Sequence, residues 1–319
     1  MNWQGKSVLI TGGAGFIGSH LTNRLHRLGA GVIVVDDLST GDKNKVEAAC
    51  NAFIEGDVSQ SSTYKKIKRF DVDYIFHFGS PSSVVLFNKK PDDCIYKTIF
   101  GFRRVLELAE EKEVTKLIYP SSGSVYGDAP VPQTEDMMPK PTNLYGVCKL
   151  TCEQLAKLSL DKVPSVGLRI FAGYGPGEEA KGEIASVITL FAKAILKGGR
   201  PVIYGNGQQD RDFVFIEDIL AATLKAAETD YTGVVNVGSG ESYSFNKLVD
   251  VTNKLVDVTN KLLRKNTKPL YVNKPMRYLE RTLASREVQD KVLGFRPTAL
   301  EVGIGKLLDY LKEKDSLKQ

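Results

Sequence analysis

The sequence predicts an α/β fold in which a parallel sheet is covered by helices on both faces. Short apolar runs typical of buried strands recur along the first half of the chain, and helical stretches fall between most of them. Strands that alternate with helices favour parallel pairing, because each crossover lays a helix against one face of the sheet. A glycine-rich turn directly after the first run, followed by a helical pattern, is the second observation that predicts this fold.

The first strand is expected at 7–11, the run Ser-Val-Leu-Ile-Thr, followed by the turn Gly12-Gly-Ala-Gly15-Phe-Ile-Gly18. Apolar residues then recur at helical spacing (Ile17, Leu21, Leu25 and Leu28), and the next apolar run, 32–35, ends at Asp36. Glycines let such a turn approach a pyrophosphate, whose charge rests on the N–H groups at the helix start. An acid about 20 residues after the turn completes the pattern of a dinucleotide site.

Asp36 is expected to accept hydrogen bonds from the adenosine ribose, and its charge would repel the extra phosphate of NADP. We therefore expect the site to prefer NAD over NADP. A role as a turn residue fits the neighbouring Asp37 better. Further strands are expected at 53–54, 73–78, 116–119 and 166–171.

Length and composition indicate an ordinary globular protein. The 319 residues are 42% hydrophobic and 25% charged, which suffices for a full core and two lobes. The net charge of +5 is spread along the chain, so it favours anionic ligands over nucleic acid. Neither a signal segment nor an apolar run near 18 residues is found, and we expect no membrane insertion.

The cysteines and histidines exclude an obvious metal site. Cys50, Cys94, Cys148 and Cys152 form no Cys-x-x-Cys pair, and the chain has three histidines. This grouping lacks metal-ligand spacing. We interpret the cysteines as reduced thiols of a cytoplasmic protein.

Tyr145 and Lys149 stand one helical turn apart and therefore share a helix face. A nearby cation favours the phenolate, so Lys149 is expected to lower the pKa of Tyr145 from about 10 towards neutrality. Tyr145 would then serve as a proton acceptor. The same spacing occurs at three other places (Tyr64/Lys68, Tyr243/Lys247 and Tyr310/Lys314), so the spacing alone does not identify the pair.

The joint order of several motifs is more specific. They are the glycine turn through His20, Val35-Asp-Asp-Leu-Ser-Thr-Gly41, Ser121-Ser-Gly-Ser-Val-Tyr-Gly127, Tyr145-x-x-x-Lys149, Arg169-Ile-Phe-Ala-Gly-Tyr-Gly-Pro176, 204–214 and Asn236-Val-Gly-Ser-Gly240. With them the chain resembles the extended short-chain dehydrogenase/reductases. Within that group it resembles the NAD-dependent sugar-nucleotide epimerase/dehydratase family, and the UDP-glucose 4-epimerases in particular.

The resemblance implies a Rossmann-type doubly wound parallel sheet with a smaller α/β substrate-binding lobe. Residues 1–171, with return segments near 205–240, would hold NAD. Residues 172–319 would mainly bind a nucleoside diphosphate sugar, expected to be a UDP-sugar. The helix starting near Tyr145 and the helix around 100–112 would pair in a homodimer.

The resemblance also assigns roles to individual residues. The catalytic set is Tyr145, Lys149 and Ser122, with Ser122 bridging tyrosine and substrate. The cofactor set is Gly12, Gly15, Phe16, Ile17, Gly18, Asp36, Asp37, Ser39, Thr40, Gly41, Asp57, Val58, Phe78, Gly79, Ser80, Tyr145 and Lys149. The substrate set is Ser82, Ser124, Tyr145, Phe171, Arg211, Arg277 and Thr282, with Arg277 favoured over Arg281 for the diphosphate.

Gly123 and Ser124 narrow the reaction. Dehydratases and decarboxylases of the family carry carboxylates beside the catalytic Ser or Thr, and this chain carries none there. Epimerisation remains: Tyr145 takes the proton of the sugar 4-hydroxyl while hydride passes to NAD, and the 4-keto sugar takes hydride back on its other face. The alternatives are a sugar-nucleotide reductase, dehydrogenase or decarboxylase, and a non-catalytic nucleotide sensor or RNA-associated scaffold.

Some positions depart from the family pattern. Ala172 and Thr98 stand where Asn is common, and 78–83 replaces a more usual Ala-Ala run, so the identity of the sugar stays open. The small Thr282 is expected to admit N-acetylated sugars. Residues 246–252 are repeated letter for letter as 253–259, and we interpret the repeat as a tandem duplication within a surface helix that keeps Leu248, Leu255 and Leu262 on one face.

Overall fold

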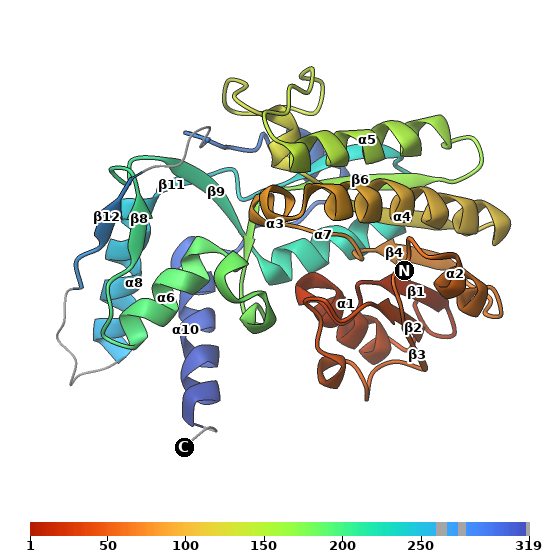
Figure 1. Cartoon of the computed structure of the whole chain (residues 1–319), viewed down its shortest axis with the longest axis horizontal. Coiled ribbons are helices and arrows are strands. Elements are labelled where there is room, and N and C mark those ends of the chain that lie inside the picture. Colours follow the sequence, from red (N-terminus) through yellow and green to blue (C-terminus); the bar gives the residue numbers. More distant parts are fainter. Residues whose placement is uncertain (260–266, 274–278, 317–319) are drawn as a thin grey trace.

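A parallel sheet runs through the centre of the computed structural model, which describes residues 1–259, 267–273 and 279–316. Its strands lie in the order β10-β6-β5-β4-β1-β2-β3 (Figure 1). They are β1 (Ser7–Thr11), β2 (Gly31–Asp36), β3 (Ala52–Glu55), β4 (Tyr74–His77), β5 (Lys116–Ser122), β6 (Ser165–Ile170) and β10 (Gly233–Val237). All six pairings are parallel, and the predicted fold class is confirmed.

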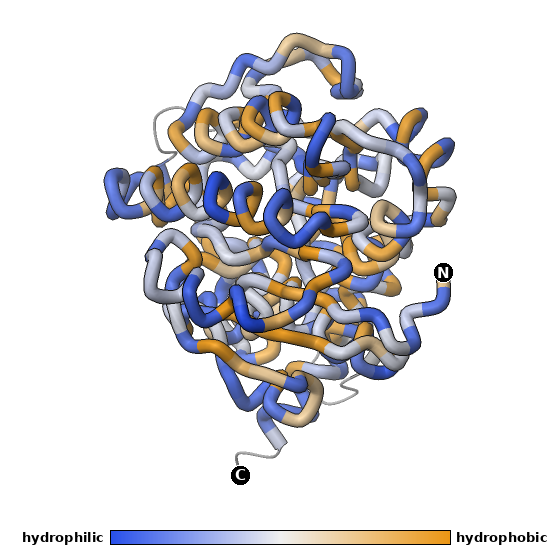
Figure 2. The backbone as a smooth tube through the Cα atoms, turned by 90° about the vertical axis from the view of Figure 1, so that its right-hand side faces the viewer, coloured by the Kyte–Doolittle hydropathy of each residue, from blue (hydrophilic) through white to orange (hydrophobic). Residues whose placement is uncertain are grey.

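Helices form a layer on each face of this sheet. They are α1 (Phe16–Arg27), α2 (Ser61–Ile67), α3 (Val84–Lys89), α4 (Pro91–Glu111), α5 (Leu144–Leu158), α7 (Ile216–Glu228) and α9 (Glu287–Val292). Val8 and Ile10 of β1 pack in a core with α1 and α7, whereas Leu9 packs in a second core with α4 and α5. This alternation follows from the two-residue period of a strand. Hydrophobic and hydrophilic residues alternate along the outer helices (Figure 2).

The direction of strand addition reverses beside β1. Its neighbours are β2 on one side and β4 on the other. In open α/β sheets, ligands bind beyond the carboxyl ends of the strands at such a reversal. The glycine turn at 12–15 directly follows β1, Asp36 is the last residue of β2, and the segment 78–80 directly follows β4. The sheet therefore brings these three predicted pieces to one edge.

A second group of elements lies beside the sheet at its carboxyl edge. It contains a three-stranded sheet of β11 (Ser242–Ser244), β9 (Asp210–Phe215) and β7 (Ala172–Tyr174), and a two-stranded sheet of β12 (Leu270–Val272) and β8 (Val202–Tyr204). Its helices are α6 (Val187–Leu196), α8 (Phe245–Thr259) and α10 (Leu300–Ser316). These helices share a core with Phe16 of α1 and Ile216 of α7.

The duplicated segment forms one continuous helix, α8, as expected. Leu248 of the first copy and Val256 of the second are both buried in the same core, and Leu255 packs against it. Leu262 lies outside the described residues. The helix therefore contributes buried side chains to this core and is not only a surface helix.

The two copies are held by different partners at their equivalent asparagines. Asn246 donates from Nδ2 to the Asn206 carbonyl at 3.0 Å and accepts from the Tyr271 hydroxyl at 2.9 Å. Asn253 exchanges hydrogen bonds with the backbone of Thr267 at 3.0 and 3.3 Å. The two copies therefore have the same sequence but different hydrogen-bond partners.

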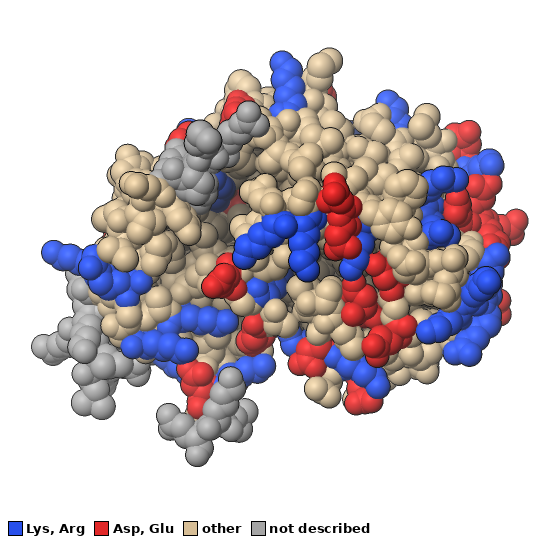
Figure 3. Space-filling view, viewed as in Figure 1, with Lys and Arg blue, Asp and Glu red and all other residues tan. Residues whose placement is uncertain are grey.

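Charges of both signs are interspersed over the face shown in Figure 3. The cysteines are free. Among the described residues, three or more His, Cys, Asp or Glu side chains nowhere come together in a way that could hold a metal ion. In the same part of the chain, none of the helices has the length and apolar character needed to cross a membrane.

Candidate functional site

The glycine turn forms a tight cradle at the start of α1. Gly12 has φ of +66°, and a Cβ there would lie 2.5 Å from the carbonyl carbon of Phe78. A Cβ on Gly18 would lie 2.0 Å from the Gly12 carbonyl oxygen. The glycines therefore let the turn, the end of β4 and the first turn of α1 approach each other closely. The first N–H groups of α1 have no acceptor within the helix, so they can receive a diphosphate.

Asp36 is buried at the end of β2 and orders the loop around it. Its carboxylate accepts hydrogen bonds from the N–H groups of Ala14 and Leu38, each at 2.9 Å. Burial raises its pKa, and these two hydrogen bonds oppose the shift. Leu38 has φ of +56°, a conformation that the hydrogen bond to Asp36 holds in place. A Cβ on Gly41 would lie 2.5 Å from Asp36 Oδ1, so the loop passes directly over this carboxylate.

Asp37 has the turn role expected of it, and it also belongs to a charged group at this edge. It accepts hydrogen bonds from the N–H and the hydroxyl of Ser39. Lys97 of α4 lies 3.0 Å from Asp37 and 3.5 Å from Asp57. Asp57 in turn accepts from the N–H of Ser59 at 2.8 Å. Lys97 therefore joins the loops after β2 and β3, a contact that the sequence did not reveal.

Other predicted cofactor residues lie at the same edge. Thr40 follows Ser39 in the loop that Asp36 orders, and Val58 is buried beside Asp57. Thr98 is 1% exposed, and its hydroxyl has no hydrogen-bond partner among the described residues. A buried hydroxyl without a partner costs free energy, so a polar ligand group would satisfy it. The glycine cradle and this hydroxyl fit a bound dinucleotide.

The segment after β4 links the cofactor edge to Lys149. The N–H of Gly79 donates to the Thr11 hydroxyl at 3.1 Å. Ser80 then accepts a hydrogen bond from Lys149 Nζ at 2.9 Å. Lys149 is buried, and burial lowers its pKa.

Tyr145 and Ser122 lie close together at the start of α5. Asn143 caps α5 by accepting from the Gly146 N–H at 2.9 Å, which places Tyr145 in the first turn. Its phenol is hydrogen-bonded to the Ser122 side chain, and its ring lies 5.5 Å from that of Phe87. The Ser122 hydroxyl also accepts from the Ser124 N–H at 3.1 Å, which fixes its direction.

The expected fall in the pKa of Tyr145 is wrong. Burial raises the pKa of this phenol, and the hydrogen bond from Ser122 is what opposes the rise. Lys149 Nζ lies 5.7 Å from the ring centroid, but it donates to Ser80 and is itself desolvated. The spacing correctly brings the two side chains together, yet it gives no measure of the desolvation that raises the pKa of Tyr145.

The other Tyr-x-x-x-Lys pairs differ in their surroundings. Lys68 and Lys314 also lie over their tyrosine rings, at 5.0 and 5.4 Å. Both lysine side chains are exposed, and they pair with Glu111 and Glu179. Burial of the lysine beside a serine-bonded phenol therefore distinguishes Lys149.

The predicted substrate residues are only partly gathered. Phe171 is buried against Gly123, directly beside Ser122. Ser82 precedes α3, the helix that carries Phe87. Arg211 donates to the carbonyls of Leu279 and Glu280 at 2.5 and 3.2 Å, so its guanidinium lies against the backbone of 279–280.

Three other expectations concern that segment. Thr282 is buried, and its hydroxyl accepts from the Asp212 N–H at 3.4 Å. Arg281 lies 3.3 Å from Asp210. Arg277 lies outside the described residues.

The sequence did not indicate the buried polar network that lies behind Ser122. Arg169 of β6 and Glu153 of α5 form a bidentate pair at 2.9 and 2.7 Å, and Ser121 donates to Glu153 at 2.5 Å. Arg169 also donates to the Tyr126 hydroxyl at 2.9 Å. The two partners come from different elements, so no local pattern could have paired them.

Comparisons with known proteins agree with this geometry. Residues 8–238 match the NAD dependent epimerase/dehydratase family. A UDP-glucose 4-epimerase of Mycolicibacterium smegmatis is 30% identical over 316 residues, 96% of this chain and 98% of that protein.

Two solved structures have the same fold over almost their whole length. One is a UDP-N-acetylglucosamine 4-epimerase from Methanobrevibacter ruminantium in complex with UDP-N-acetylmuramic acid (28% identity, TM-score 0.89, covering 98% of this chain and 99% of that one). The other is a Thermus thermophilus UDP-glucose 4-epimerase in complex with NAD (26% identity, TM-score 0.86, covering 96% and 99%).

Proposed function

The chain belongs to the NAD dependent epimerase/dehydratase family, and on that premise we propose that it is a nucleotide-sugar 4-epimerase that interconverts UDP-glucose and UDP-galactose. NAD is its cofactor. The observation that carries the proposal is the meeting of Ser122, Tyr145 and the buried Lys149. The residues that follow Ser122 are Gly123 and Ser124, not the carboxylates that dehydration or decarboxylation would use.

In the proposed reaction, Tyr145 acts as the base that takes the proton of the sugar 4-hydroxyl and later returns it. Ser122 donates to the phenol oxygen and so stabilises the phenolate. Lys149 supplies positive charge beside the same ring. When bound at the glycine turn and Asp36, NAD would supply the hydride chemistry at carbon 4 of the sugar. Because the cofactor is regenerated in each cycle, no second substrate is consumed.

The two parts of the chain would divide the binding work. Residues 1–171, with the return segments near 205–240, would hold NAD at the carboxyl edge of the sheet. Residues 172–319 would mainly bind the UDP-sugar. Arg211 supports this division, because a guanidinium suits phosphate oxygens and it lies beside the segment that contains Thr282.

The test is incubation of the purified protein with UDP-glucose, UDP-galactose and UDP-N-acetylglucosamine, without added cofactor, followed by proton NMR of the products. We expect each active substrate to give its 4-epimer without net NADH absorbance. Net NADH formation, or a requirement for added reductant, would instead favour a dehydrogenase or reductase. Tyr145→Phe is the matched control: it should slow epimerisation about 10²- to 10⁴-fold with NAD still bound.

We also propose that two copies pair through α4 and α5, which lie side by side (Figure 1). Tyr96 and Phe100 stack at 5.0 Å on the exposed side of α4, and Leu144 and Val147 are exposed on α5. Pairing would remove this apolar surface from water. Light scattering after gel filtration should give twice the chain mass for the wild type and a smaller mass for Phe100→Glu; a monomeric wild type would contradict the proposal.

A further inference from the structure

The ammonium group of Lys149 is buried with a single hydrogen bond to support its charge. The residue is 3% exposed, and in the part of the chain that the structure describes its one hydrogen-bond acceptor is the Ser80 hydroxyl, 2.9 Å from Nζ. The titratable side chains near it include no carboxylate: they are Tyr145, Cys148 and Cys152 of α5 and His77 of β4. An ammonium group has three N–H donors, so Ser80 uses one and leaves two for a bound ligand.

Ser80 itself is fixed by the turn that follows β4. The preceding N–H, that of Gly79, donates to the Thr11 hydroxyl of β1 at 3.1 Å. A Cβ on Gly79 would lie 3.0 Å from the Gly12 nitrogen, so the turn lies tightly against the glycine turn. Pro81 follows Ser80, and a proline restricts the backbone of the residue before it. The hydroxyl is therefore held by the sheet and not by the helix that carries the lysine.

This hydrogen bond determines where the charge of Lys149 lies. A lysine side chain is long and flexible, so an acceptor on a different element is needed to fix its end. With Ser80 as that acceptor, Nζ lies 5.7 Å from the centroid of the Tyr145 ring. The phenol of Tyr145 is at the same time hydrogen-bonded to Ser122. Two serines from the ends of two neighbouring strands, β4 and β5, thus orient the two side chains of α5.

We propose that Ser80 is a positioning residue of the reaction, which holds the Lys149 ammonium group beside the Tyr145 ring and favours its charged form. The inference rests on the proposed function, in which this charge supports the phenolate. Burial lowers the pKa of Lys149, and a hydrogen bond to the charged form opposes that fall. Without the hydroxyl, Lys149 should therefore lose its proton at lower pH.

The test is an NMR titration of Lys149 in protein that is isotope-labelled at the lysine ε carbons. The signal is assigned by its absence from Lys149→Met. In Ser80→Ala we expect the titration midpoint of Lys149 to fall by about one pH unit, whereas Ser80→Thr keeps the hydroxyl and should stay close to the wild type. In the epimerase assay, kcat of Ser80→Ala should fall about tenfold with KM almost unchanged, and the alkaline limb of its pH profile should move to lower pH.

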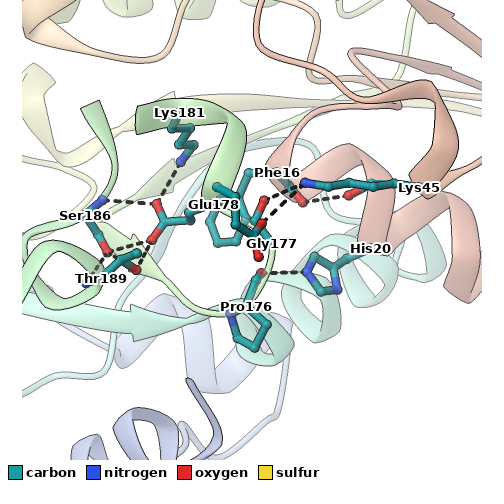
Figure 4. A network of polar contacts seen from close by, with 11 residues as sticks. Phe16, His20, Lys45, Pro176, Gly177, Glu178, Lys181, Ser186 and Thr189 are labelled. Atoms are coloured by element: carbon teal, nitrogen blue, oxygen red, sulfur yellow. Dashed lines mark hydrogen bonds and ion pairs between the residues drawn. The ribbon is translucent and has the colours of Figure 1, made fainter. Parts of the chain in front are cut away.

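Lys45 offers a matched control, because it is a lysine whose end is also held by an acceptor from a distant part of the chain. Its Nζ donates to the Gly177 carbonyl at 2.8 Å, which joins the loop between β7 and α6 to the first part of the chain (Figure 4). This contact involves neither Ser80 nor Lys149. Lys45→Met should therefore lower the urea midpoint but leave the titration of Lys149 and both limbs of the pH profile unchanged.

The proposal is overturned if Lys149 titrates at the same pH in Ser80→Ala and in the wild type. It is also overturned if Lys45→Met shifts this titration as far as Ser80→Ala does, because general destabilisation would then explain the effect. Ser80→Cys, whose thiol is a weak acceptor, repeats the measurement in case the Ala variant folds poorly. Failure of the proposed function gives a different result: the wild type would not epimerise the UDP-sugars, while the titration of Lys149 would still respond to Ser80.

Discussion

Breaking the buried pair of Arg169 and Glu153 should be among the most damaging single substitutions in the chain. Both side chains are 4% exposed, and the pair is bidentate. Arg169→Met would leave the Glu153 carboxylate buried with the Ser121 hydroxyl as its remaining side-chain donor. Removal of one partner from such a pair costs about 3–5 kcal/mol. We expect a loss of about 4 kcal/mol in the free energy of unfolding.

The assay is urea unfolding followed by circular dichroism. Wild type and variants are compared where the slope of the free energy of unfolding against urea concentration is the same for both. Glu153→Leu combined with Arg169→Met removes both charges and should recover most of the loss, because no unpaired charge stays buried. Lys162→Met is the surface control: Lys162 and Glu110 lie 2.6 Å apart, but both are well exposed. Its unfolding midpoint should equal that of the wild type.

The outcome that would refute this reasoning is a loss below about 1 kcal/mol for Arg169→Met, the range of exposed pairs. If the double variant is as unstable as Arg169→Met alone, the loss of stability comes from packing and not from the unpaired charge. A second readout concerns activity. Ser121 is bound to Glu153 and precedes Ser122, so kcat should fall in Glu153→Gln even where the protein remains folded.

Three further predictions concern single groups and the repeat. Ser122→Ala removes the hydrogen bond that opposes the raised pKa of Tyr145, so the acidic limb of the kcat/KM pH profile should move to higher pH. If the limb does not move, Ser122 does not influence the pKa of the base. Burial lowers the pKa of His77 to about 3, so below pH 6.5 the imidazole binds a proton in the unfolded chain but not in the folded chain. Stability should therefore fall as pH falls, by about 1.4 kcal/mol per unit, and urea titrations at pH 6.5 and 5 should show a smaller fall for His77→Asn. Deletion of 253–259 shortens α8 by two turns without turning its apolar face, so the protein should stay folded and active; gel filtration and the epimerase assay would detect a loss of fold or activity.

The sheet could be predicted because its determinants are local. The apolar runs are short and continuous in sequence, and β1 (Ser7–Thr11) matches its prediction residue for residue. The glycine turn and Asp36 follow the same logic, since the first directly follows β1 and the second is the last residue of β2.

The rest depended on partners that are distant in sequence. Arg169 and Glu153 lie 16 residues apart on different elements, and Lys45 meets Gly177 across 132 residues. The pKa of Tyr145 depends on the balance between desolvation and the hydrogen bond from Ser122, which the spacing of Tyr145 and Lys149 cannot supply. Thr282 and Arg211 were assigned by resemblance, and their contacts with Asp212 and the 279–280 carbonyls had no sequence signal.

The repeat in α8 makes the register of that helix degenerate. A slide of the helix by one copy would place the same letters at 246–255, because 253–262 repeats them, and the two alignments would differ only from Val256 onward. The choice falls to the polar ends, where Asn246 meets Tyr271 and Asn253 meets Thr267. A substitution in only one copy would mark it and make the two alignments unequal in energy. Point mutations that accumulate in one copy and not in the other would therefore progressively lock this helix into a single alignment.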